Sequence, residues 1–239
     1  MTMPVPPAAR PELLELPIPR YLEKAYFWAY IHPGSVRLFE REWLINVILL
    51  GNYARLRDAA ISELGAVVSG TTLQFACVYG NLTACLLERL APEATLEVVD
   101  ILPIQLRNLA RKLPRDARLT LKQGDTSSLA NEDASVDQVL LFFLLHEQPD
   151  PIRRKTLAEA LRVVKPGGRV VIVDYHRPRR WHPLRPFMRL VFRTLEPYAV
   201  DLWTQDMASL LPPAASLASM HTTTYFGGLY QLFVLTRSG

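Results

Sequence analysis

Histidine and acidic side chains follow two apolar segments of this 239-residue chain, at the points where those segments end. His146 and Glu147 come directly after one apolar run, and Asp174 and His176 lie at the end of another. If both runs are neighbouring strands, the four side chains share one edge of a sheet. Imidazole and carboxylate together suit a divalent metal ion, which can polarise a carbonyl as a Lewis acid. Asp174 could instead only cap its strand, so the residue types leave both interpretations open.

A second group of residues has the spacing of a nucleotide-binding unit. Residues 73–77 are a predicted strand, residues 81–90 a predicted helix, and Gly80 lies between them. Asp100 ends the next predicted strand, 96–100, where a carboxylate can accept hydrogen bonds from ribose hydroxyls. Such turns normally carry several glycines, which permit positive φ and close approach of a ligand. One glycine and one acid alone are weak evidence, because many buried strands end in Asp.

The remaining elements of the middle of the chain alternate between helix and strand. In order, they are a helix at 104–112, a strand at 119–123, a strand at 138–145, a helix at 151–164 stopped by Pro166 and two glycines, and a strand at 169–174. This alternation predicts an α/β fold with a doubly wound, mostly parallel, Rossmann-like sheet. The 49% hydrophobic content suits one large domain buried on both sheet faces.

Residues 1–54 are predicted to form a proline-rich and aromatic helical extension ahead of a main domain at 55–239. Pro33-Gly34 divides the aromatic part into two helices, the second at 35–50 with Ser35 as its N-cap. The extension either packs over the core or forms a lid over an apolar substrate, and the two interpretations are compatible.

A basic amphipathic insert is predicted at 177–193, which contains six arginines, several aromatic and aliphatic residues, and no acid. An anionic bilayer surface attracts such a segment. The same composition could bind nucleic acid or form a packed helix with solvated arginines. The membrane interpretation is preferred, and nucleic acid comes last because no recognisable nucleic-acid module accompanies the arginines.

The composition of the chain indicates the cellular compartment in which the protein is found. Cys77 and Cys85 define neither a disulfide framework nor a metal cluster, so we expect core thiols in a reducing compartment. Residues 1–19 lack the apolar region of a cleavable signal peptide, and no apolar run is long enough to span a bilayer. We expect a cytoplasmic protein, peripherally associated with the inner membrane.

The order of Gly80, Asp100, Asp125 and the helical segment that ends in Lys165-Pro166-Gly167-Gly168 resembles the class I S-adenosylmethionine-dependent methyltransferases, particularly their quinone-modifying branch. The resemblance covers roughly residues 55–175. It implies that the cofactor's amino-acid moiety is bound by the turn residues Ala76, Cys77, Val78, Tyr79 and Gly80. It further implies that Asp100 and Ile101 bind the ribose, and that Asp125 and Thr126 bind the adenine. Gln74, Ala76 and Val78 depart from that family's acid and glycine positions, which argues against ordinary methyl transfer.

Four segments, at 77–80, 142–149, 173–178 and 181–186, resemble those of the rhodoquinone biosynthesis enzymes, and this similarity spans nearly the whole chain. The resemblance implies conversion of ubiquinone to rhodoquinone, in which an amino group replaces a ring methoxy group. In that family S-adenosylmethionine donates the amine and manganese (Mn2+) is required.

This reaction is an addition and elimination on the quinone ring. The amine must be aimed at the ring, a carbonyl polarised, and the leaving oxygen protonated. We expect Tyr79 and Val78 to force the cofactor's amino-acid end into a new pose. His146, Glu147, Asp174 and His176 are the candidate manganese ligands, with Tyr79, His146 and His176 as catalytic candidates.

Two alternatives stay open. The chain could be a methyltransferase that acts on a quinone or another lipid and tolerates the altered turn. It could also be a non-catalytic cofactor-binding protein. The sequence does not fix the oligomeric state.

Overall fold

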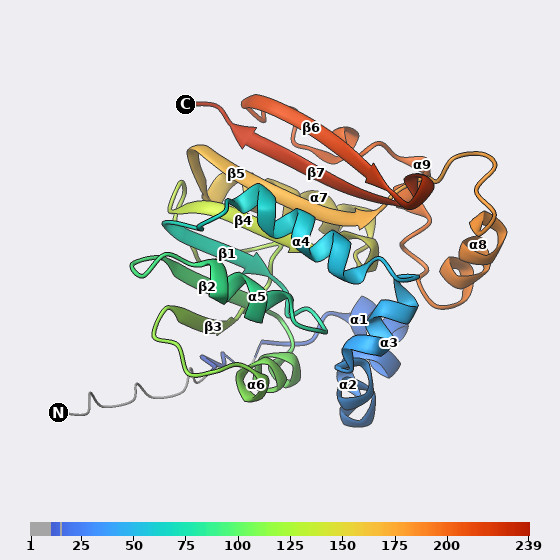
Figure 1. Cartoon of the computed structure of the whole chain (residues 1–239), viewed down its shortest axis with the longest axis horizontal. Coiled ribbons are helices and arrows are strands. Elements are labelled where there is room, and N and C mark those ends of the chain that lie inside the picture. Colours follow the sequence, from blue (N-terminus) through green and yellow to red (C-terminus); the bar gives the residue numbers. More distant parts are fainter. Residues whose placement is uncertain (1–10, 15) are drawn as a thin grey trace.

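A single seven-stranded sheet forms the centre of the computed structural model, which describes residues 11–14 and 16–239 (Figure 1). Part of the proline-rich segment lies outside these residues. In their order across the sheet the strands are β3 (Leu119–Gln123), β2 (Thr95–Asp100), β1 (Thr71–Phe75), β4 (Val136–Phe142), β5 (Val164–Tyr175), β7 (Tyr230–Arg237) and β6 (Leu217–Tyr225). β1 to β5 are parallel, whereas β7 and β6 are antiparallel. The predicted doubly wound, mostly parallel fold is confirmed.

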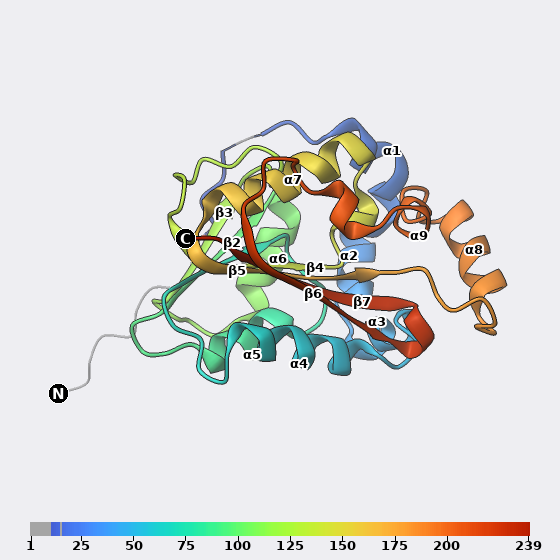
Figure 2. The same ribbon diagram turned by 90° about the horizontal axis from the view of Figure 1, so that it is seen from above.

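Helices cover both faces of the sheet. Figure 2 shows α4 (Tyr53–Leu64) and α5 (Leu82–Arg89) on one face and α7 (Asp150–Val163) on the other. α6 (Pro103–Lys112) shares the core of α4 and α5. Leu140 of β4 packs into this core, and its neighbour Leu141 packs into the core beneath α7. Successive residues of one strand therefore fill opposite layers, as the pleat requires.

Short helices gather at the edge where the parallel strands end (Figure 1). They are α1 (Arg20–Tyr26), the π-helix Phe27–Ile31, α2 (Pro33–Phe39), α3 (Glu42–Ile48), α8 (Arg185–Thr194) and α9 (Asp201–Thr204). No helix in the described ranges is long and apolar enough to cross a bilayer.

The predicted helix at 35–50 is wrong in its bounds. α2 already begins at Pro33, whose missing N–H costs nothing in the first helical turn. His32, not Ser35, caps it, since its Nδ1 accepts a hydrogen bond from the Gly34 N–H at 3.2 Å. The helix ends at Phe39, and α3 starts separately after the extended residue Arg41.

Two other boundaries differ from the prediction. The strand predicted at 138–145 ends at Phe142, because Phe143 adopts a φ of +53° and turns the chain. The helix before Pro166 ends at Val163, close to its predicted end, but the strand predicted at 169–174 already begins at Val164 and includes the segment 165–168.

Arg153 of α7 is completely buried and ties the site edge together. Its guanidinium donates to the carbonyls of Leu145 (2.8 Å), Gln148 (2.8 Å) and Tyr198 (2.9 Å). The first two carbonyls flank His146, and the third follows α8. One buried cation thus joins the loop after β4 to the segment that carries α8.

We expect Arg153→Met to lower the free energy of unfolding by roughly 3 kcal/mol or more, because three carbonyls lose their donors. Arg154→Met is the matched control, since its ion pair with Asp150 and its hydrogen bond to the Ser209 carbonyl are both exposed and should together be worth only about 1 kcal/mol. Urea unfolding monitored by circular dichroism measures both. Equal losses in the two variants would contradict this role for Arg153.

Candidate active site

A cavity of about 570 Å³ lies at the carboxyl ends of the parallel strands. Its walls come from the turn after β1, the ends of β2 and β4, helices α1 to α3, and α8. Eight of the nine predicted cofactor-binding residues line it, namely Ala76, Cys77, Val78, Tyr79, Asp100, Ile101, Asp125 and Thr126. His146 and Glu147 line it too, whereas Gly80, Asp174 and His176 do not. Elements far apart in the sequence therefore enclose one chamber.

The turn after β1 keeps a tight conformation without its usual glycines. Ala76 has a φ of +66°, which only glycine adopts without strain, and Gly80 has a φ of +85°. Gln74, at the position of the lost acid, donates to the Ala76 carbonyl at 2.9 Å and accepts from Thr83 Oγ1 at 3.1 Å. A neutral amide thus joins strand, turn and α5.

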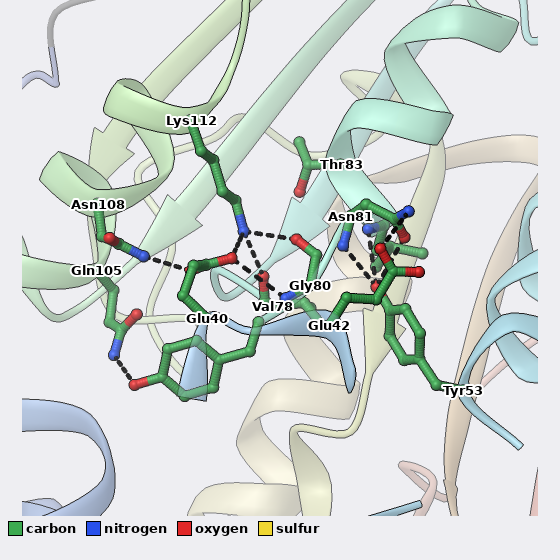
Figure 3. A network of polar contacts seen from close by, with 12 residues as sticks. Glu40, Glu42, Tyr53, Val78, Gly80, Asn81, Thr83, Gln105, Asn108 and Lys112 are labelled. Carbon is green, nitrogen blue, oxygen red and sulfur yellow. Dashed lines mark hydrogen bonds and ion pairs between the residues drawn. The ribbon is translucent and has the colours of Figure 1, made fainter. Parts of the chain in front are cut away.

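Side chains from α6 and from the end of α2 occupy the polar groups of this turn (Figure 3). Lys112 Nζ donates to the carbonyls of Val78 (3.2 Å) and Gly80 (2.7 Å) and pairs with Glu40 at 2.5 Å. Glu40 also accepts from the Gly80 N–H at 3.2 Å, and Asn108 donates to its other oxygen. An ammonium and a carboxylate of the protein itself are therefore bound to the turn.

Tyr53 of α4 covers the next residues of the same turn. Its hydroxyl oxygen accepts from the backbone N–H groups of Asn81 (2.8 Å) and Leu82 (3.0 Å) (Figure 3). A Cβ at Gly80 would lie 2.5 Å from this hydroxyl, so the close approach of Tyr53 requires glycine there. The N–H groups that a ligand normally takes at the start of the following helix are already satisfied.

Tyr79 forms a wall of the cavity. Its ring stacks on Tyr30 and Phe39, with centroids 5.7 and 5.9 Å away. Its hydroxyl donates to the Ala29 carbonyl and accepts from Gln105, both at 2.8 Å. Burial raises the pKa of Tyr79, so the phenol stays neutral. The structure thus places Tyr79 where it can position neighbouring groups, but not where it can accept or donate a proton in a reaction.

The nucleoside end of the cavity fits S-adenosylmethionine. Asp100 accepts from the N–H groups of Cys77 (2.6 Å) and Leu102 (2.8 Å), and each oxygen keeps a further lone pair for a ribose hydroxyl. Burial raises the pKa of Asp100 to about 6, against the effect of these hydrogen bonds. Asp125 is held by the Ser127 N–H and hydroxyl, at 2.8 and 2.7 Å. Cofactor binding by the predicted residues stays a prediction, with a geometry that suits it.

Asp174 orients His146 instead of facing the cavity. This fully buried carboxylate accepts from the N–H groups of Leu145, His146 and Tyr175 at 2.7 to 3.2 Å, and lies 3.0 Å from His146 Nδ1. Burial opposes charge on the imidazole, but the carboxylates of Asp174, Glu196 and Glu147 outweigh it and raise the pKa of His146 to about 9. A cationic imidazole is therefore fixed at the cavity wall.

Two carboxyl groups approach the other nitrogen of His146. Glu147 Oε1 and Glu196 Oε2 each lie 3.8 Å from His146 Nε2, and Tyr30 donates a hydrogen bond to Glu147. Burial raises the pKa of Glu147 to about 8, although His146 lowers it, and burial also raises the pKa of Glu196. The cluster combines a cation with one carboxyl group, that of Glu147, which holds its proton near neutral pH.

Three of the four predicted metal ligands, His146, Glu147 and Asp174, lie together, whereas His176 bonds elsewhere. The lone pairs of Asp174 are taken by three N–H groups and His146, and His176 Nδ1 bonds to the Gly228 carbonyl at 2.8 Å. Within the described residues, no group of three or more His, Cys, Asp or Glu side chains could hold a metal ion. The manganese ligands and the catalytic role of His176 therefore stay predictions, which this geometry does not support.

Several polar residues of the site are not predicted from the sequence, among them Glu40, Lys112, Tyr53 and Glu196. Glu196 had a signal, because it is the only acid between Asp174 and Asp201, directly after the basic stretch. The others lie on surfaces that only the folded chain brings to the turn.

Comparisons with known proteins agree with this architecture. Residues 72–168 match the family model of a methyltransferase domain. A methyltransferase from Aquifex aeolicus that depends on S-adenosylmethionine has a TM-score of 0.55 at 16% identity, over 86% of this chain and 98% of that one. This chain is therefore similar in sequence to methyltransferases and in fold to S-adenosylmethionine-dependent ones.

Sequence relatives of this methyltransferase-like protein include quinone-modifying enzymes. It is 29% identical to an uncharacterised methyltransferase of Synechocystis over 86% of this chain and 92% of the relative. It is 27% identical to the demethylmenaquinone methyltransferase of Lactococcus lactis, over 69% and 68% of the two chains. Identity is 31% to a ubiquinone/menaquinone biosynthesis C-methyltransferase of Syntrophotalea carbinolica, over 59% and 60%.

We expect Asp100→Asn to weaken binding of S-adenosylhomocysteine about 10- to 100-fold, because a charged acceptor of ribose hydroxyls is lost. Wild-type affinity should also fall as the pH drops below about 6, where Asp100 takes up a proton. Calorimetric titration measures both effects. Glu93→Gln, at an exposed position, is the control, and unchanged affinity in Asp100→Asn would rule out the ribose role.

Proposed function

We propose that this protein is an S-adenosylmethionine-using transferase that converts ubiquinone to rhodoquinone, exchanging a ring methoxy group for an amine. The observation that carries the proposal is the filled turn after β1. Glu40, Lys112 and Tyr53 already occupy the groups that hold the cofactor's amino-acid end in the usual pose. That end must then lie elsewhere in the cavity, so the sulfonium methyl group is not aimed at the substrate as in an ordinary methyltransferase.

The lining of the cavity supports a quinone substrate. Aromatic side chains line the wall beside His146 and Glu147, and apolar side chains of α3 and α8 continue it toward the surface. A flat ring with a polar edge suits the first part, and an isoprenoid tail suits the second. The relatives named for menaquinone and ubiquinone methylation support the same substrate class.

The residues of the cavity suit the chemistry of exchange. Bound S-adenosylmethionine would supply the amine nitrogen. Cationic His146 can donate a hydrogen bond to a quinone oxygen and stabilise negative charge there. Protonated Glu147 can give its proton to the methoxy oxygen, so that the ring C–N bond forms, the C–O bond breaks and methanol leaves, while the attacking nitrogen returns a proton to Glu147. The nitrogen then still carries the donor's carbon skeleton, and a separate cleavage of the donor's own C–N bond is needed to free the ring amine. Asp174 keeps the imidazole oriented throughout.

Manganese enters this proposal through the resemblance alone. The four residues predicted to hold it do not form a site, so no step is assigned to the metal. The reaction is therefore to be run with and without manganese.

We also propose that the protein works at the cytoplasmic face of the inner membrane. Exposed apolar side chains of α3 and α8 belong to the same walls that line the cavity, among them Val47, Ile48, Phe187 and Leu195. A lipid quinone could then reach the cavity without crossing water.

The product mass tests the proposed reaction. Incubation with ubiquinone and S-adenosylmethionine should give a quinone that has lost methoxy and gained an amine. An added methyl group on a demethylated quinone would select the alternative, quinone methylation, which the names of the relatives favour. If no quinone is converted to a product, the remaining alternative is a cofactor-binding protein that has no catalytic activity.

The pH profile tests the acid. The raised pKa values mean that Glu147 holds its proton below about pH 8 and His146 below about pH 9, so turnover should fall as the pH rises through this range. Glu147→Gln cannot give up a proton and should lower kcat about 100-fold or more. Glu23→Gln, exposed on α1, is the control. A wild-type rate still rising above pH 9 would remove Glu147 and His146 as proton donors.

A further inference from the structure

A second cavity, of about 620 Å³, lies between α8 and α9. Its lining includes four arginines, Arg177, Arg185, Arg189 and Arg193, together with Trp203 and other apolar residues, and no acid. α8 separates this chamber from the first, because Phe187, Met188 and Val191 of the same helix line the quinone cavity. The two chambers thus share one wall.

The four guanidinium groups have no counter-charge in the described part of the chain. None of them takes part in an ion pair or a side-chain hydrogen bond there, whereas seven other arginines of the described chain do. Desolvation and the like charges of Arg189, Arg177 and Arg180 lower the pKa of Arg185. Repulsion among unpaired cations is unfavourable unless an anion joins them.

Two buried N–H groups in the lining residues also lack acceptors. Arg185 Nε and Trp203 Nε1 are both shielded from solvent and have no hydrogen-bond partner among the described residues. Trp203 packs against Phe192, with ring centroids 5.0 Å apart, which fixes its indole. Buried donors without acceptors are costly, and a small shift of the lining side chains would let both donate to an anion held by the four cations.

We propose that this cavity, the arginine pocket, binds a phosphate group. A guanidinium offers two parallel N–H groups that match two phosphate oxygens, and the remaining oxygens suit the other donors. The phosphate is either a lipid headgroup at an anionic membrane or a free phosphate anion. The inference is independent of which group the enzyme transfers, since none of the four arginines lines the quinone cavity.

Vesicle and solution binding by the full chain test the proposal. Vesicles of phosphatidylcholine with phosphatidic acid should bind the protein more tightly than vesicles of equal surface charge that contain oleic acid, because only the first present phosphate. In a separate arm, inorganic phosphate is titrated calorimetrically. Preference for the phosphatidic acid vesicles identifies the headgroup, and binding of inorganic phosphate without that preference identifies the free anion.

Variants locate the site. We expect Arg185→Gln/Arg189→Gln to weaken phosphate binding about tenfold or more, and Trp203→Phe, which keeps the ring but loses the N–H, to weaken it severalfold. Arg107→Gln/Arg111→Gln, on the exposed side of α6, removes the same charge elsewhere and should retain binding. Thermal unfolding checks that each variant is folded.

Two results would overturn the proposal. One is a wild-type protein that neither distinguishes the two vesicle types nor binds inorganic phosphate. The other is an equal loss of binding in the α6 variant, which would mean that net charge alone attracts the anion.

Discussion

The turn after β1 is the constraint on which the rest of this structure depends. Its backbone N–H and carbonyl groups must be satisfied, and three side chains from different elements, Glu40, Lys112 and Tyr53, satisfy them. These contacts fasten the N-terminal extension and α6 to the sheet. They also close the turn against the backbone contacts that a cofactor's amino acid would make. One set of hydrogen bonds thus shapes both the fold of the extension and the space left for chemistry.

Acid–base capacity in the cavity follows from a second fully buried group. Asp174 has no access to solvent, and its negative charge is balanced by backbone N–H groups and by His146. Because His146 is charged, Glu147 and Glu196 can lie close to it, while burial keeps their pKa values high. The same charge pattern places a cation and a protonated carboxyl group side by side at the cavity wall.

The helix α8 joins the two chambers of the molecule. One side contributes apolar residues to the cavity beside His146, and its arginines line the other chamber. This division explains why a segment with six arginines and many apolar residues stays folded against the protein: Met188 and Phe192 are buried in the core, while the guanidinium groups remain outside it. Arg153 fixes the start of the following segment through the Tyr198 carbonyl.

The sequence by itself determined the order of strands and helices, the parallel sheet, and the place of Asp100 and Asp125 at strand ends, because these follow from local periodicity and βαβ spacing. It could not determine the helix breaks near Glu40, the C-terminal antiparallel strands, or which side chains meet the turn. Asp174 and His176 were equally good candidates in the sequence, because both lie at the end of the same strand. In the structure Asp174 accepts hydrogen bonds from buried N–H groups, whereas His176 bonds to the Gly228 carbonyl. Only the tertiary structure decided which of the two side chains is buried in the site, because the hydrogen-bond partners of each come from distant parts of the chain.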